Sequence, residues 1–84
     1  MEMKEVSSSQ IHSVGHDPET NTLRIRFRDR THRNGVIIPG STYEYDGVPA
    51  EVHAGLLAAE SVGAHFGTHI RNGGFAYRKI EVEA

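Results

Sequence analysis

One stretch of the chain alternates strictly between apolar and charged residues, and this pattern constrains the fold most. It runs from Thr22 to Arg28. The apolar members are Leu23, Ile25 and Phe27, and the charged members are Arg24, Arg26 and Arg28. A period of two is typical of a β-strand that buries one face and exposes the other. The segment therefore predicts a sheet that is covered on one side.

Weaker patterns predict the remaining elements. We expect strands at residues 11–16, 42–45 and 77–82, and helices at 49–59 and 61–70. Turn-forming residues separate them, such as the Asp46-Gly47 pair, and Ser61 is suited to cap the second helix. The sequence thus predicts an α+β fold: a small antiparallel sheet of three to four strands with two short helices on one face. The expected order is β-β-β-α-α-β.

The expected core follows from these elements. Val48 is expected to pack against the start of the first helix. The predicted core residues are Ile11, Val14, Leu23, Ile25, Phe27, Tyr43, Tyr45, Val52, Leu56, Phe66, Ile70, Ile80 and Val82.

A chain of 84 residues suits one domain. We expect a flexible leader at 1–8 and a single domain at 9–84, with an extended loop at 29–41. The absence of cysteine excludes a disulfide framework, and the absence of a long apolar run argues against a membrane span. We therefore expect a cytoplasmic protein. Homo-oligomerisation would bury additional surface in so small a domain.

A set of short motifs, in one order along about 65 residues, resembles the KTSC domain, a module found at the C-terminus of some bacterial lysyl-tRNA synthetases and in small free-standing bacterial and phage proteins. The motifs are Val6-Ser7-Ser8, Val14-Gly15-His16-Asp17, Leu23 to Phe27, Tyr43-Glu44-Tyr45, Val48-Pro49, Ala59-x-Ser61-x-Gly63, Phe66 and Ile70-Arg71. The loop at 29–41 is longer than is usual in that family. The resemblance implies an α+β fold and suggests RNA binding.

Arginines are the main candidates for binding an anion. Residues 23–33 hold five arginines and one aspartate, whereas residues 34–60 hold four acidic residues and no Lys or Arg. Three arginines on one strand face would stand about 6.6–7 Å apart, which suits successive phosphates. Pairing with Glu44 across strands is the competing interpretation. The candidate residues are Arg24, Arg26, Arg28, Arg30, Arg33, Arg71 and Arg78.

Tyr43 and Tyr45 share one strand face and have two interpretations. They are either core residues or a surface on which bases stack. With only six aromatic residues in the chain, core packing is favoured.

Other chemistry has little support. His65 and His69 share a helix face, as paired metal ligands do, but no third ligand is apparent, so no metal or other cofactor is expected. No catalytic constellation is recognisable, and we expect no enzymatic activity.

Three functions remain open at this stage. The first is a nucleic-acid-binding module that prefers RNA and uses the arginines. The others are a protein-interaction or assembly module and a binder of a small phosphorylated or nucleotide ligand.

Overall fold

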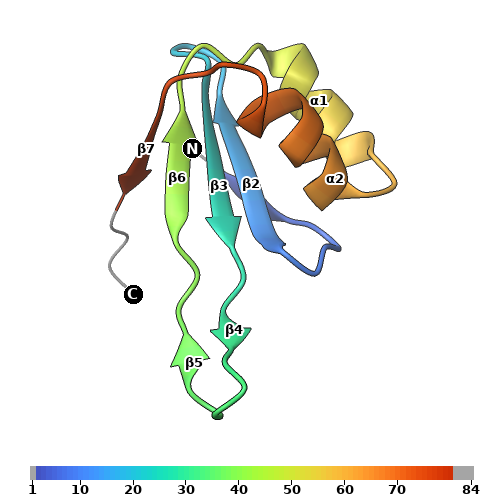
Figure 1. Ribbon diagram of the computed structural model, residues 1–84. Coiled ribbons are helices and arrows are strands. Elements are labelled where there is room, and N and C mark those ends of the chain that lie inside the picture. Colours follow the sequence, from blue (N-terminus) through green and yellow to red (C-terminus); the bar gives the residue numbers. More distant parts are fainter. Residues whose placement is uncertain (1, 81–84) are drawn as a thin grey trace.

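The alternating segment forms the central strand of a five-stranded antiparallel sheet. The computed structural model describes residues 2–80. The sheet has the order β1-β2-β3-β6-β7 (Figure 1). Its strands are β1 (Met3–Glu5), β2 (Ile11–Asp17), β3 (Thr22–Phe27), β6 (Thr42–Tyr45) and β7 (Tyr77–Ile80). The α+β class and the expected element order are confirmed, and the sheet has more strands than the three or four expected.

The register of the strands brings the apolar residues to one face. Ile25 lies between Val14 of β2 and Tyr43 of β6, and Leu23 lies opposite Tyr45. A β-bulge between Ile11 and Ser13 shifts the β2 pairing, so that Ile11 and Val14 both face the core although they are three positions apart.

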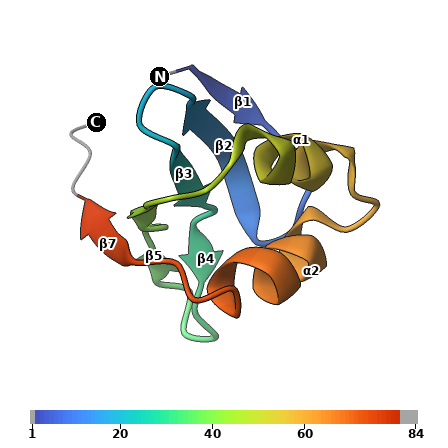
Figure 2. The same ribbon diagram turned by 90° about the horizontal axis from the view of Figure 1, so that it is seen from above.

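Both helices cover this apolar face of the sheet (Figure 2). They are α1 (Ala50–Ala58) and α2 (Val62–Phe66), and α2 continues as the π-helical turn η1 (Gly67–Arg71). The expected cap of the second helix is present, because the Ser61 hydroxyl accepts a hydrogen bond of 3.3 Å from the backbone N–H of Ala64.

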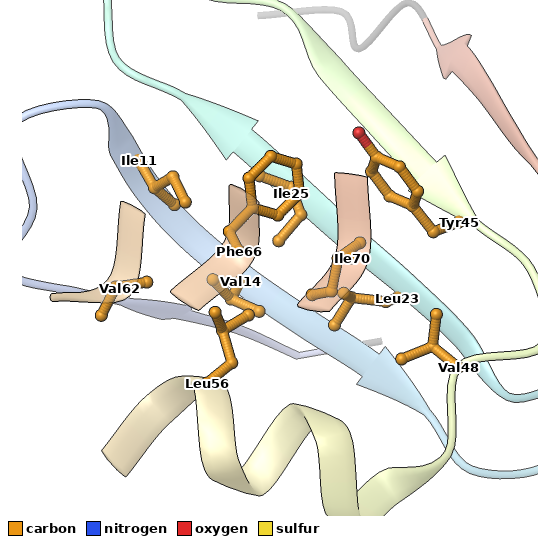
Figure 3. Close-up of a cluster of buried hydrophobic side chains, with 10 residues drawn as sticks. All are labelled: Ile11, Val14, Leu23, Ile25, Tyr45, Val48, Leu56, Val62, Phe66 and Ile70. Carbon is orange, nitrogen blue, oxygen red and sulfur yellow. The ribbon is translucent and has the colours of Figure 1, made fainter. Parts of the chain in front are cut away.

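The core lies between the helices and the sheet (Figure 3). It consists of Ile11, Val14, Leu23, Ile25, Tyr45, Val48, Leu56, Val62, Phe66 and Ile70. Eight of these were predicted as core; Val48 was expected only at the helix start, and Val62 was missed. Among the other predicted members, Phe27, Tyr43 and Val52 are partly buried against the cluster. The prediction for Ile80 is wrong, because it pairs with Thr42 on the sheet face opposite the helices and is only half-buried there. Val82 lies outside the described residues.

Two segments differ from the expected organisation. Met3–Glu5 lies within the predicted leader, yet it forms β1 and pairs with β2. Residues 29–41, expected as a loop, contain a second small sheet of β4 (Arg30–Thr31) and β5 (Ile37–Ile38). We call residues 29–41 the arm, because it projects beyond the ends of β3 and β6 (Figure 1).

Two histidines join β2 to α1. The rings of His16 and His53 stack with their centroids 5.2 Å apart, and His16 Nε2 lies 2.7 Å from the carbonyl oxygen of Val48. The Nε2 atom of His53 is buried and has no hydrogen-bond partner among the described residues. Burial lowers the pKa of His53, and the nearby His16 and Lys4 lower it further. Folding therefore favours the neutral form of this ring.

No helix within residues 2–80 has the length and apolar character needed to cross a membrane.

We expect Tyr45→Ala to lower the melting temperature by more than about 10 °C. Tyr45 is 7% exposed, and its ring packs at 5.6 Å from that of Phe66. Truncation of a buried aromatic residue costs about 3–5 kcal/mol, and each kcal/mol shifts the melting temperature of a small domain by about 4–8 °C. Tyr45→Phe, the control, keeps the ring and should melt close to the parent. Calorimetry in which the Ala variant also melts like the parent would show that this ring does not hold the core together.

We also expect the protein to lose stability as the pH falls below the ordinary histidine pKa of 6.5. The folded state binds a proton at His53 less readily than the unfolded state does, so acid favours unfolding. The melting temperature should therefore fall between about pH 7.5 and pH 5.5. His53→Phe keeps a ring against His16 and should show a smaller fall. Some dependence should remain, because burial also lowers the pKa of His65. An equal fall in parent and variant would contradict this assignment.

Candidate functional site

The seven candidate arginines separate into three groups. Arg24, Arg26 and Arg78 lie on the sheet face opposite the helices, as the strand register requires. Arg28, Arg30 and Arg71 line a pocket at the end of the sheet. Arg33 is exposed in the turn of the arm. The expected row of three arginines along one strand therefore has only two members on that face, because β3 ends at Phe27.

On the face without helices, most of the positive charge is neutralised by acidic side chains. Nε and one terminal nitrogen of Arg24 donate hydrogen bonds of 2.9 and 2.6 Å to one oxygen of Glu44. Arg78 donates a 2.8 Å bond to the other oxygen and also pairs with Asp46. The Asp46 partner raises the pKa of Arg78. Glu44 is 8% exposed and lies between the two arginines. On this face, Arg24 and Arg78 therefore form cross-strand ion pairs with Glu44.

The other two arginines of the predicted row differ from each other. Arg26 is exposed, and its guanidinium makes no hydrogen bond within residues 2–80. Arg28 is half-buried and donates hydrogen bonds to the carbonyl oxygens of Ser8 and Val6, at 2.5 and 2.9 Å. Arg28 thereby fastens the connection between β1 and β2, which is a structural role.

A pocket of about 430 Å³ lies where the arm leaves the sheet, and three of the candidate arginines line it. The aromatic rings of Phe27 and Tyr43 meet edge to face in it, with centroids 5.9 Å apart. The lining residues are Ser9, Gln10, Phe27, Arg28, Arg30, Pro39, Gly40, Ser41, Tyr43 and Arg71. Aromatic surface thus adjoins three guanidinium groups in one place.

Arg30 and Arg71 supply the charge that is available in this pocket. Both side chains are exposed, and neither makes a hydrogen bond to the part of the chain that the structure describes. Arg71 comes from η1, and its guanidinium carbon lies 5.9 Å from the centroid of the Phe66 ring, within cation–π range. Arg30 comes from the first strand of the arm. Two separate elements therefore deliver positive charge to the same pocket.

The two tyrosines have different roles. Tyr45 belongs to the core, and its buried ring offers no surface on which a base could stack. Burial raises the pKa of its hydroxyl, although the nearby Arg71 lowers it. Tyr43 is half-buried and lines the pocket. Only Tyr43 therefore remains a candidate for stacking.

Sequence patterns did not identify the backbone feature that shapes the pocket. At Gly40, a Cβ atom would overlap the carbonyl group of Phe27, so the arm can approach β3 this closely only with glycine there. The Gly40 N–H also donates a 2.8 Å hydrogen bond to the Asp29 carboxylate. The Pro39-Gly40 pair in the sequence indicated a break in the strand, but not a close contact with β3.

The paired histidines do lie together. The rings of His65 and His69 have centroids 4.1 Å apart, and His65 packs over Gly55 of α1. Within residues 2–80, no group of three or more His, Asp or Glu side chains is placed to hold a metal ion.

Comparison with known proteins yields one family. A family model described as the KTSC domain matches residues 7–75, a range that includes every residue lining the pocket. An uncharacterised protein of Stutzerimonas stutzeri is 35% identical over 81 residues, which make up 94% of this chain and 100% of that protein. A protein of Tsukamurella paurometabola is 43% identical over 61 residues, or 73% of this chain and 76% of that one.

A solved structure has the same fold. The crystal structure of a KTSC domain protein from Yersinia pestis superposes with a TM-score of 0.73 at 36% sequence identity. The match covers 95% of this chain and 97% of the other. The likeness therefore extends over the whole domain and is not confined to the sheet.

We expect Gly40→Ala to destabilise the protein and Gly67→Ala to stabilise it. The added methyl group at Gly40 meets the backbone of β3, which has to move away. At Gly67 no atom lies within 4 Å of the added methyl, and alanine in a helix is favoured over glycine by about 1 kcal/mol. Melting curves of the two variants should thus shift in opposite directions. A Gly40→Ala protein that melts at or above the parent temperature would mean that the arm does not press against β3.

Proposed function

The chain belongs to the KTSC domain family, and we propose that it acts as a non-enzymatic module that binds single-stranded RNA through the pocket between the arm and the sheet. The observation that carries this proposal is the meeting of Arg30 and Arg71 with the exposed part of Tyr43 in one pocket. Single-stranded nucleic acids are bound where basic groups contact the phosphates and aromatic rings contact the bases.

The pocket suits this role better than the row of arginines that the sequence predicts on β3. Arg24 is paired with Glu44, and Arg28 is bound to two backbone carbonyl groups, so a phosphate would have to displace existing bonds. The face without helices also has no aromatic ring on β3 or β6 beside Arg26, because both tyrosines of β6 point toward the helices. Arg30 and Arg71 have no such competing partners within residues 2–80.

A small phosphorylated or nucleotide ligand is the second candidate, and the size of the pocket favours it. A volume of about 430 Å³ falls within the range of about 300–1,000 Å³ typical of small-molecule sites. The same guanidinium groups would then hold the phosphate. A free mononucleotide used as a competitor separates this candidate from RNA.

The test is the salt dependence of binding to a labelled single-stranded RNA of about 12 nucleotides, within the usual site size for such modules. We expect fluorescence anisotropy to give an affinity that falls steeply with salt. The double variant Arg30→Gln/Arg71→Gln should bind more weakly and flatten the slope of log affinity against log salt by about 1.4, since each lost phosphate contact contributes about 0.7. Arg26→Gln is the matched control, because it removes an exposed arginine from the opposite face.

Three results would contradict the proposal. The first is an absence of binding even at low salt. The second is a salt slope that Arg26→Gln flattens and Arg30→Gln/Arg71→Gln leaves unchanged. That result would place the RNA on the sheet face without helices. The third is full competition by a mononucleotide at the affinity of the RNA, which would identify the small ligand as the partner.

A further inference from the structure

The arm exposes apolar residues that the fold does not need. Val36, Ile37 and Ile38 are 57%, 64% and 37% exposed and stand in sequence on a ribbon of two short strands. A two-stranded ribbon alone is marginally stable in water, and exposed consecutive apolar residues usually mark a contact surface. The arm therefore has the composition of a surface that receives a partner.

The register of the arm gives it two distinct faces. Arg30 pairs with Ile38, and Thr31 pairs with Ile37. Because opposite residues in an antiparallel pair point to the same side, Arg30 and Ile38 share one face while Thr31 and Ile37 share the other. Arg30 also lines the pocket, so the face that Arg30 shares with Ile38 adjoins the pocket.

The charge of the arm indicates what this face receives. The arm contains Arg30 and Arg33 and a single acidic residue, Asp29, whose carboxylate already accepts a hydrogen bond from Gly40. Arg33 is exposed, and its guanidinium makes no hydrogen bond within the described residues. The arm thus carries a cationic side chain opposite an apolar one beside the pocket, and a second cationic side chain in its turn. A partner with both phosphates and bases requires both kinds of contact.

We propose that the Arg30–Ile38 face of the arm extends the pocket into a longer site for one nucleic-acid strand. Arg30 and Arg33 contact phosphates, while Ile38 contacts the bases of nucleotides that leave the pocket. This inference rests on the proposed function, since it assigns to the arm the part of an RNA strand that the pocket cannot enclose.

The test uses two isoleucines that are neighbours in sequence and lie on opposite faces. Ile38→Ser should weaken binding of an RNA of about 12 nucleotides by about five- to tenfold, the loss expected for one partly buried aliphatic contact. Ile37→Ser should stay within about twofold of the parent. Neither change should alter binding of an RNA dinucleotide, which is short enough to stay at the pocket of about 430 Å³. Because both side chains are exposed, both variants should melt like the parent.

The outcomes that overturn the inference are distinct from those that overturn the function. If both serine variants bind the long RNA like the parent, while Arg30→Gln/Arg71→Gln still weakens it, the arm beyond Arg30 is not part of the site and the pocket stands. If Ile37→Ser has the larger effect, the RNA contacts the opposite face of the arm and the assignment to the Arg30–Ile38 face is wrong. If light scattering shows that either variant abolishes a dimer, the arm contacts a second copy of the chain instead. If the parent binds neither RNA, the function and the inference fall together.

Discussion

The burial of one aromatic ring, that of Phe66, fixes the relation between the helices and the sheet. Phe66 is 2% exposed, and its ring meets those of Phe27 and Tyr45 edge to face, each at 5.6 Å. Phe27 belongs to β3 and Tyr45 to β6, so a single side chain holds α2 across two neighbouring strands. The continuation of α2 into η1 then carries Arg71 over the same ring and toward the pocket. The packing that stabilises the fold thereby also positions a residue of the candidate site.

On the opposite face of the sheet, the cost of burying a charged side chain determines which residues pair. Glu44 is nearly buried in the middle of β6, where an unpaired carboxylate would be strongly unfavourable. Arg24 and Arg78 approach it from the two neighbouring strands and satisfy both of its oxygens. The basic segment and the acidic segment of the sequence thus neutralise each other in part within the fold. Of the arginines that remain available, Arg26 lies on this face, and the others lie at the pocket and on the arm.

The sequence could predict those elements that are determined by residues close together along the chain. The alternation around Ile25 located β3 and its buried face, and Ser61 located the start of α2. Pairing of Glu44 with a strand arginine also followed, because strand direction and side-chain alternation were enough to place them on one face. β1 could not be predicted in this way, since Met3–Glu5 is short and has no apolar period; its place comes from backbone pairing with β2. The pocket was also beyond sequence patterns, because it requires the end of β3, η1 and the arm to converge.

The arginines illustrate why residue type alone did not locate the candidate site. Each carries the same charge, and the pattern of the sequence made Arg24, Arg26 and Arg28 look equivalent. In the fold, however, a guanidinium can bind a ligand only with donors that the protein has not already used. Arg24 and Arg78 use theirs on carboxylates and Arg28 on carbonyl groups, whereas Arg30 and Arg71 retain theirs at the edge of an aromatic pocket. Arg28 differs from Arg24 and Arg26 because β3 ends at Phe27, one residue before it. If the strand continued by one residue, Arg28 would lie on the face without helices; instead it binds the segment that joins β1 to β2.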